Sequence, residues 1–518
     1  MGVVAVVLVI VVFIILSPRQ AEKRQGIFVQ GVWFGEREHI YQIHTDTYID
    51  YDFLSEHNLI DTYHETTMGQ IYIYKDFNRY TIDLTIEPTK VFQEIEDSIF
   101  INLNYLEGKF KDSYKAIAYP EVVFLEKNEH VVMNDQTIWF YDGYNQPMHK
   151  IQRVAPKSQW VVYDTIEDYV YVRYNDQVGY IRNWDVSTLS IHHNRESLHT
   201  NYFKEIVLAW DFFTRRPTTF QPDPIYPGLN VVSPTWFEID IDTYTYKDWH
   251  LQDYVDYYEA IQIQVWPAFS NAFNPRVTSE ILNNYTKRWQ LINEIIQISK
   301  TYGYKGINID FENIYLEDKD VFALFIRDLY IAARRENIIM SIDLTIISNS
   351  PTWSMFYDRE VLGEYSDYLM LMAYDERTRP EHGIGSIASL PWVEFGVDHL
   401  LNYAPNHKIV LGLPFYTRLW ETIRENGTVK YDVTALKITT AENFVANRDF
   451  VIVYDEEAGQ FYGEYTEGNV FYQIWIEDTV SLSNRLAIVE KYDLAGVAVW
   501  ALDYGSLEMW QVIKDFFR

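Results

Sequence analysis

Cysteine is absent from the 518 residues of this sequence. This absence excludes disulfides, thiolate metal sites, iron–sulfur clusters and a cysteine nucleophile. The sequence also lacks a Gly-x-Ser-x-Gly motif, which argues against a serine hydrolase built on a nucleophile elbow. The side chains left for catalysis are carboxylates, histidine, serine, threonine, tyrosine and lysine.

Basic residues are scarce, with 43 Lys and Arg against 74 Asp and Glu, so that the formal net charge is -31. Phosphate backbones and anionic lipid surfaces repel a chain this acidic. The composition therefore argues against nucleic acid as a partner.

Long hydrophobic runs are also rare. Residues 3–16 form an uncharged apolar run that, with its flanks, just reaches the roughly 17 residues a spanning helix needs. Either a membrane anchor or the apolar part of a signal peptide fits this run. Ser17-Pro18-Arg19 follows in place of a small-residue cleavage site, which favours an anchor. We expect an extracytoplasmic protein, anchored through residues 3–16 or secreted if residues 1–18 are cleaved.

Aromatic residues, by contrast, are abundant, with 42 Tyr, 29 Phe and 15 Trp. A chain with 48% hydrophobic residues has enough apolar material for packed cores, which excludes a disordered protein. At roughly 150 residues per domain, the length predicts about three folded units.

Two small regions are expected in the N-terminal part. Residues 30–125 alternate short strands and polar turns, which predicts an α+β region whose chemistry the sequence does not reveal. Residues 130–187 carry strand patterns only and end on Gly179-Tyr180-Ile181 followed by Arg182. This ending resembles the bacterial SH3-like modules that accompany cell-wall enzymes, and an unrelated small β-barrel is an equal alternative.

Residues 202–518 alternate strand and helix patterns, which predicts an α/β fold, the (β/α)8 TIM barrel. Strands are expected at 206–210, 231–233, 261–266, 306–311, 340–344, 368–372, 409–414 and 496–500. Amphipathic helices are expected at 279–302, 320–336, 392–403 and 481–492. Residues 421–471 interrupt the alternation, which indicates an inserted α+β lobe.

The fourth expected strand holds the polar residues that matter most. Residues 306–312 read Gly-Ile-Asn-Ile-Asp-Phe-Glu, so Asn308, Asp310 and Glu312 share one face of the strand. A barrel interior is normally filled by branched aliphatic side chains, and buried carboxylates there cost free energy. Because Glu312 comes last, at the C-terminal mouth where barrel active sites lie, we interpret the column as catalytic.

This column resembles the strand-four signature of family 18 glycoside hydrolases, Asp-Gly-x-Asp-x-Asp-x-Glu. Residues 371–376 (Leu-Met-Ala-Tyr-Asp-Glu), 411–416 (Leu-Gly-Leu-Pro-Phe-Tyr) and 496–500 (Gly-Val-Ala-Val-Trp) resemble the family's motifs on strands six, seven and eight, in the same order. Residues 233–236 and 473–478 are most similar to the spore-cortex-lytic branch of N-acetylglucosaminidases, in which wall-binding modules often precede the barrel.

The resemblance implies a retaining, substrate-assisted hydrolase of β-1,4 bonds at N-acetylglucosamine units, in which the substrate's own acetamido oxygen attacks the anomeric carbon. By this resemblance Glu312 would be the general acid and then the base. Asp310 would hold the acetamido N–H, Tyr374 would hydrogen-bond the acetamido carbonyl, and Asp375 would contact the same sugar. The implied substrate is peptidoglycan of the spore cortex, at the cell wall or spore envelope, and chitin is the alternative. No cofactor is implied.

The resemblance also implies a set of substrate-binding residues. These are Asn308, Trp500, Tyr416, Arg418, Trp236, Met372 and Glu376. Trp500 would form an apolar floor under the sugar ring. For Tyr416, Arg418 and Trp236, packing at the rim is an equally good interpretation, and Met372 would line the wall.

Lys305 and Asn308 stand where the family signature has Asp. An aspartate at 308 could share a proton with Asp310, whereas an amide can only donate a hydrogen bond to it. We therefore expect Asp310 to stay ionised and its charge to raise the pKa of Glu312.

Two other classes of function compete with hydrolysis. A catalytically silent saccharide-binding barrel would keep Trp500 and Tyr374 but has no need of Glu312. A metal-dependent wall hydrolase or deacetylase would need ligands such as His192, His193 and His199, which lie in a polar stretch without partners at ligand spacing. The sequence therefore predicts a hydrolase without a metal site.

Overall fold

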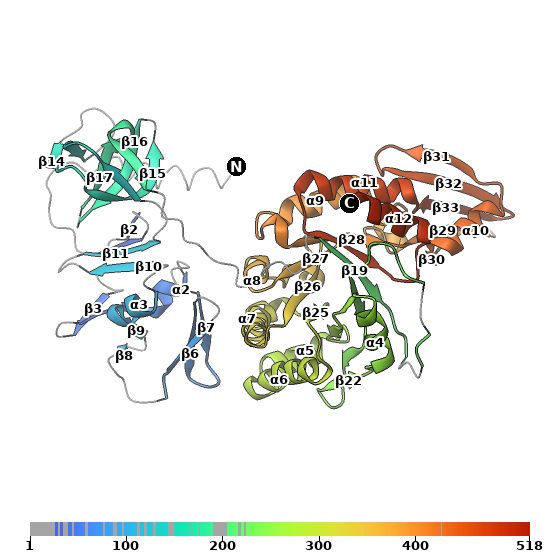
Figure 1. Cartoon of the computed structure of the whole chain (residues 1–518), viewed down its shortest axis with the longest axis horizontal. Coiled ribbons are helices and arrows are strands. Elements are labelled where there is room, and N and C mark those ends of the chain that lie inside the picture. Colours follow the sequence, from blue (N-terminus) through green and yellow to red (C-terminus); the bar gives the residue numbers. More distant parts are fainter. Residues whose placement is uncertain are drawn as a thin grey trace. The chain divides into compact units, whose positions relative to one another are not determined.

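The computed structural model of the chain consists of two compact units, Met1–Leu198 and His199–Arg518 (Figure 1). Residues 3–16, His192, His193 and His199 lie outside the part that the structure describes. None of the described helices is long and apolar enough to cross a membrane. The structure describes residues 26–29, 32–34, 40–43, 46–56, 61–75, 78–85, 91–95, 98–110, 114–118, 122–127, 131–142, 150–166, 168–175, 177–189, 205–215, 219–221, 224–425 and 427–518.

The first unit begins with a mixed region of short strands and two helices, α2 (Tyr51–Glu56) and α3 (Leu103–Phe110). Its sheets have the strand orders β10-β11-β1-β2, β3-β4-β9-β8 and β5-β6-β7. The strands are β1 (Gly26–Val29), β2 (Val32–Phe34), β3 (Ile40–Ile43), β4 (Asp46–Asp50), β5 (Asp61–Glu65), β6 (Gln70–Lys75), β7 (Asn78–Asp83), β8 (Phe92–Ile95), β9 (Ser98–Asn102), β10 (Tyr114–Ala118) and β11 (Val122–Lys127). Ile49, Ile71 and Ile101 lie in one buried cluster, as the α+β interpretation requires.

A seven-stranded sheet follows, in the order β14-β13-β17-β16-β15-β12-β18. Its strands are β12 (Val131–Asn134), β13 (Ile138–Tyr141), β14 (Lys150–Val154), β15 (Gln159–Ile166), β16 (Tyr169–Tyr174), β17 (Gln177–Arg182) and β18 (Val186–Leu189). Phe140 and Trp160 form its fully buried centre, and the Trp160 Nε1–H donates to Asn134 Oδ1 at 3.1 Å. The residues predicted as a β module thus form one, and its likeness to SH3-like modules stays a prediction.

The second unit is a closed barrel of parallel strands. The strand positions are β19 (Ile206–Asp211), β20 (Val231–Pro234) with β21 (Phe237–Ile239), β23 (Gln264–Val265) with β24 (Ala268–Ser270), β25 (Gly306–Asp310), β26 (Ile339–Thr345), β27 (Tyr368–Met372), β28 (Ile409–Pro414) and β34 (Gly496–Trp500). The barrel closes because β34 pairs with both β28 and β19. A short strand, β22 (Tyr246–Asp248), adds antiparallel to β21.

Helices cover the outside of the barrel, as α5, α6 and α7 show beside β25 in Figure 1. They are α4 (Gln252–Ala260), α5 (Pro275–Leu282), α6 (Tyr285–Tyr302), α7 (Lys319–Arg335), α8 (Arg359–Glu364), α9 (Leu390–Leu400), α11 (Thr479–Tyr492) and α12 (Leu507–Phe516). The single helix predicted at 279–302 is wrong. It is interrupted before α6, because the Asn284 side chain accepts from the Lys287 N–H and caps a new helix.

The third barrel strand also differs from its predicted range, 261–266. The structure has β23 and β24 on either side of Trp266 and Pro267. Proline has no N–H to donate to a neighbouring strand, which explains the interruption. The remaining predicted barrel strands agree with the observed ones to within one or two residues.

The inserted lobe is wider than the predicted 421–471. It consists of β29 (Tyr416–Glu425), β30 (Thr428–Lys437), α10 (Ile438–Ala446), β31 (Val451–Asp455), β32 (Gln460–Glu467) and β33 (Val470–Ile476), in the sheet order β30-β29-β33-β32-β31. Just after β33, a fully buried ion pair joins Glu477 to Arg485 of α11 at 2.6 Å. Arg485 also donates to the Ala388 carbonyl, so this pair ties the end of the lobe to the barrel.

Candidate active site

The predicted alternation along β25 is confirmed. Ile307 and Ile309 are fully buried, and the Phe311 ring packs 5.3 Å from Phe325 of α7 on the outside of the barrel. Asn308 lies on the opposite face and contacts residues of three other barrel strands. The polar column therefore faces the barrel interior, where Asp310 and Glu312 reach its C-terminal mouth.

Asn308 is the centre of a hydrogen-bond network across that interior. Its Oδ1 accepts from Trp210 Nε1 at 2.9 Å and from Ser233 Oγ at 3.3 Å. Its Nδ2 donates to Ser341 Oγ at 3.0 Å and to Asp343 Oδ1 at 2.7 Å. The amide is fully used by these four contacts. The expected hydrogen bond from Asn308 to Asp310 is therefore wrong, because Asp343 on the neighbouring strand takes the donor.

Asp310 and Glu312 share a weakly solvated site. Burial raises the pKa of Asp310 to about 6, and its Oδ1 has no hydrogen-bond partner among the described residues. Burial raises the pKa of Glu312 well above its usual range, with further contributions from the charges of Asp310 and Asp343. The prediction for Glu312 is confirmed in direction. Because the pKa of Asp310 is about 6, the expectation that Asp310 stays ionised beside Glu312 holds only above that pH.

The backbone that carries Glu312 is clamped from both sides. The Glu312 N–H donates to Asn271 Oδ1 at 3.1 Å, and Asn271 Nδ2 donates back to the Glu312 carbonyl at 2.7 Å. The Tyr357 hydroxyl donates to the Phe311 carbonyl at 3.1 Å. These contacts hold the backbone at the start of the loop after β25. The backbone position from which the Glu312 side chain extends is therefore fixed.

Asp375 follows β27 with a φ of 67°, a backbone conformation that is uncommon outside glycine. Its Oδ1 accepts from the Tyr416 hydroxyl at 2.6 Å and from Arg418 at 2.8 Å. Tyr416 and Arg418 are two residues apart on β29 and therefore point the same way. The structure thus brings three of the predicted site residues together, and the lobe holds the carboxylate of a barrel loop.

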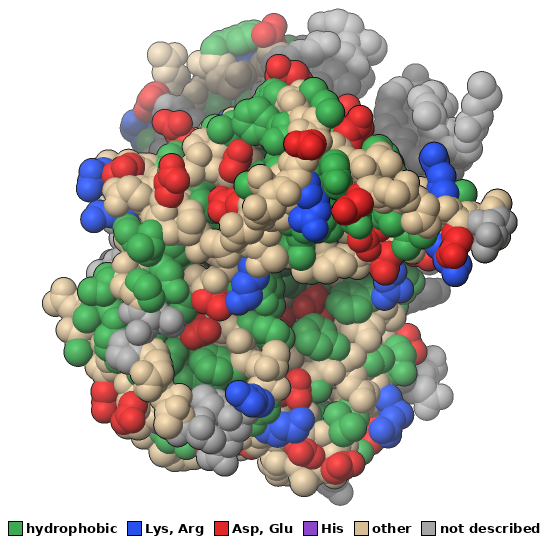
Figure 2. Space-filling model, turned by 90° about the vertical axis from the view of Figure 1, so that its right-hand side faces the viewer, with side chains coloured by type: hydrophobic (Ala, Val, Ile, Leu, Met, Phe, Trp, Pro, Cys, Tyr) green, Lys and Arg blue, Asp and Glu red, His purple; other side chains and the backbone are tan. Residues whose placement is uncertain are grey.

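An aromatic group borders the carboxylates. The Trp500 ring lies 6.1 Å from Trp210 and 5.5 Å from Phe212, and the Tyr374 ring meets Trp210 edge-on at 6.4 Å. Met372, Tyr374 and Trp500 pack on the buried cluster that fills the barrel interior. Figure 2 shows a hollow in one face of the molecule, with acidic side chains inside it and hydrophobic ones around it.

Trp236 does not lie at the rim. It is 0% exposed, and its ring packs edge-on against Tyr254 at 5.0 Å and His250 at 5.6 Å. The predicted sugar contact does not fit this position, because the indole has no accessible face. The alternative, packing at the rim, is right about packing and wrong about the place, because Trp236 is fully buried.

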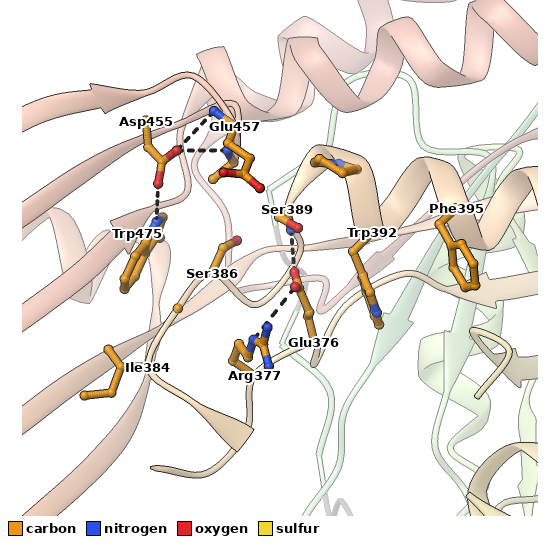
Figure 3. Close-up of a pocket in the computed structure, with 13 residues that line it drawn as sticks. Glu376, Arg377, Ile384, Ser386, Ser389, Trp392, Phe395, Asp455, Glu457 and Trp475 are labelled. Atoms are coloured by element: carbon orange, nitrogen blue, oxygen red, sulfur yellow. Dashed lines mark hydrogen bonds and ion pairs between the residues drawn. The ribbon is translucent and has the colours of Figure 1, made fainter. Parts of the chain in front are cut away.

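Glu376 lies apart from the other carboxyls, in a pocket of about 660 Å³ that does not include Glu312. Its carboxylate accepts from the Ser389 N–H at 3.0 Å and lies 3.8 Å from Arg377 Nε. Figure 3 shows Trp392 and Phe395 of α9 on one side of this pocket and Trp475 of the lobe on the other. The contacts of the Glu376 carboxylate are thus with Ser389 and Arg377, and neither Asp310 nor Glu312 lines this pocket.

Sequence reasoning missed Asp343 and Asn271. Residues 341, 343 and 345 of β26 are Ser, Asp and Thr, so this strand repeats the alternation of polar residues seen on β25. That pattern alone would have pointed to Asp343. Asn271 lies in a loop, and nothing in its sequence neighbourhood indicates the clamp on Glu312. Among the described residues, no group of three or more His, Asp or Glu could hold a metal ion.

Comparisons with solved structures agree with this fold. The spore cortex-lytic enzyme SleL of Bacillus megaterium QM B1551 superposes with a TM-score of 0.53 at 21% identity, over 61% of this chain and 74% of that chain. A chitinase of Chromobacterium violaceum ATCC 12472 superposes with a TM-score of 0.52 at 20% identity, over 60% of this chain and 99% of that chain. Both show the same barrel fold.

Sequence comparisons identify the family. The uncharacterized glycosylase YvbX of Bacillus subtilis (strain 168) is 26% identical over 274 residues, 49% of this chain and 75% of that protein. The cortical fragment-lytic enzyme of the same organism is 25% identical over 255 residues, 48% of this chain and 58% of that protein's length. Residues 176–505 match the family described as "Glycosyl hydrolases family 18". The chain therefore belongs to family 18 of the glycosyl hydrolases and is a glycoside hydrolase.

Proposed function

We propose that this enzyme cleaves β-1,4 bonds at N-acetylglucosamine units of peptidoglycan by retaining, substrate-assisted hydrolysis. The observation that carries the proposal is the pair formed at the barrel mouth by Asp310, the last residue of β25, and Glu312, two residues further along the chain. Their pKa values differ in the direction the mechanism needs, with Glu312 raised further. Between about pH 6 and the pKa of Glu312, one carboxyl is an anion and the other an acid.

Each residue then has one task. Glu312 protonates the glycosidic oxygen and afterwards activates water. Asp310 holds the acetamido N–H and stabilises the positive oxazolinium that forms when the acetamido oxygen attacks the anomeric carbon. Tyr374 orients the acetamido carbonyl, and its hydroxyl stays protonated because burial raises its pKa. Trp500 covers the apolar face of the sugar.

Peptidoglycan is proposed over chitin because a cortical fragment-lytic enzyme and the spore cortex-lytic enzyme SleL are among the relatives and neighbours. A chitinase-type chitooligosaccharide hydrolase is the second candidate, since chitinases share the fold. A silent saccharide-binding barrel is disfavoured by the clamp that Asn271 places on Glu312, because binding alone does not require a fixed acid.

Side-by-side digestion of spore cortex, vegetative wall and purified chitin tests the substrate. We expect soluble fragments from the peptidoglycan samples, ending in N-acetylglucosamine and released with the β configuration, as retention requires. Mass spectrometry identifies the fragments, and NMR taken at once gives the configuration of the new end. Cleavage of chitin alone would favour the second candidate, and an initial α product would contradict retention.

We also propose that the barrel acts outside the cytoplasmic membrane, anchored through residues 3–16. The support is the uncharged apolar run at these positions. Protease added to intact cells or forespores should then remove the barrel, while a cytoplasmic protein stays intact as control. Protection of the barrel until the membrane is opened would contradict this location.

A further inference from the structure

We propose that Asp343 is a positioning residue of this active site: held against Asn308, its carboxyl adds a third ionisable group to the Asp310–Glu312 pair and keeps the proton on the acid. This inference rests on the proposed function, because it concerns how Glu312, the proposed general acid, is kept protonated. Asp343 lies on a different strand from the signature, and the sequence motif does not contain it.

The position of Asp343 supports this role. The side chain is 2% exposed on β26, the strand that pairs with β25. Its Oδ1 accepts from Asn308 Nδ2 at 2.7 Å and its Oδ2 from Trp210 Nε1 at 3.2 Å. Both donors are neutral, and within the described residues no Lys, Arg or His is paired with this carboxylate. A buried carboxylate without a cation is costly, and burial raises the pKa of Asp343 well above its usual range, while the hydrogen bonds from Asn308 and Trp210 favour its anion. Once ionised, Asp343 acts strongly on its neighbours, because little solvent screens its charge.

Asn308 joins Asp343 to the column and cannot turn away from it. Turning the amide over would place its Nδ2 against the Trp210 Nε1–H, two donors facing each other. The Asn308 donor is therefore directed at Asp343, and Asp310 Oδ1 is left without a partner among the described residues. The amide at 308 and the carboxyl at 343 are thus complementary, because one donates the hydrogen bond that the other accepts.

The ionisable groups that act electrostatically with Asp343 are Asp310, Glu312, Tyr357 and Tyr374. All four are acids, so this cluster cannot ionise completely and holds protons in common. When Asp343 is ionised, its charge raises the pKa of Glu312, after the larger effects of burial and of Asp310. Removing that charge lowers the pKa of Glu312. Because the acid works in its protonated form, the alkaline limb of the activity profile then moves to lower pH.

The substitution Asp343→Asn in the full chain tests this inference. We expect the alkaline limb of kcat/KM to move down by roughly one pH unit, the order expected for one buried charge at an effective dielectric of about 20. KM should change less than twofold. The double variant N308D/D343N exchanges the two groups across the same hydrogen bond and should restore more than half of the shift. A merely structural role would lower activity at every pH without moving the limb.

An infrared titration separates failure of this inference from failure of the proposed function. Comparing the infrared spectra of wild type and E312Q identifies the carboxylic acid band of Glu312, because E312Q lacks this band. The band reports the protonation of Glu312 whether or not the enzyme turns over. Its midpoint should fall in D343N and return in N308D/D343N. An unchanged midpoint or an unmoved limb would overturn the role of Asp343, whereas a folded wild-type protein that cleaves no N-acetylglucosamine polymer would overturn the proposed function. If D343N does not fold, D343S removes the same charge and carries the same test.

Discussion

Glu312→Gln is expected to lower kcat by roughly 100- to 10,000-fold, the usual contribution of a general acid, while saccharide affinity stays largely intact. Glutamine has nearly the shape of glutamate, and the backbone clamp by Asn271 does not involve the side chain that changes. The loss therefore reflects the missing proton. Steady-state kinetics measure kcat, and quenching of tryptophan fluorescence by an oligosaccharide measures affinity.

Glu317→Gln is the matched control for this variant. Glu317 is exposed, lies five positions further along the chain in the short 3-10 helix Leu316–Asp318, and is not among the residues that raise the pKa of Glu312. Its substitution should leave kcat within twofold of wild type. An E312Q enzyme that kept more than a tenth of the wild-type kcat would show that another group supplies the proton.

Removing the acetyl group from the sugar in the cleaved position should be as damaging as removing the acid. Without the acetamido carbonyl no oxazolinium forms, and Tyr374 and Asp310 lose the group that we propose they orient. We expect the wild-type enzyme to leave a free-amine unit in this position intact. The measurement compares two oligosaccharides of equal length that differ only in this acetyl group, with fragments weighed after the same digestion.

The acetylated oligosaccharide serves as the positive control for that comparison. A thiazoline that mimics the cyclic intermediate should inhibit the enzyme. Efficient cleavage of the free-amine substrate would rule out substrate assistance. So would a covalent glycosyl-enzyme isolated on Asp310, Glu312 or Asp375, because it would place the site in the ordinary two-carboxylate scheme.

Local patterns predicted much of the barrel because they depend on neighbours in the chain. The alternation along residues 306–312 assigned Asn308, Asp310 and Glu312 to one face, and the structure confirms that face. Helix limits were less predictable where a capping side chain competed with the apolar pattern. Asn284 starts a new helix inside the predicted 279–302 because one side-chain hydrogen bond caps a new first turn there.

The partners of the site residues could not be predicted, because they come from distant strands. Tyr416 and Arg418 were equally consistent with packing or ligand contact, and the structure shows both holding Asp375. Trp236 follows a strand much as Trp500 ends one, yet it is buried among Tyr254 and His250. Whether an aromatic side chain faces the mouth of the barrel depends on how the chain turns after each strand.

The sequence by itself determined the barrel, the family and the carboxyl pair, since strand period, helix period and motif order are properties of the chain alone. Only the tertiary structure decided how that pair is charged. Asn308 donates to Asp343 and not to Asp310, because pairing of β25 with β26 places those two side chains in contact. The pKa of a buried carboxyl depends on such neighbours and on the loss of contact with solvent. Both depend on how distant strands pack together, which the order of residues alone does not show.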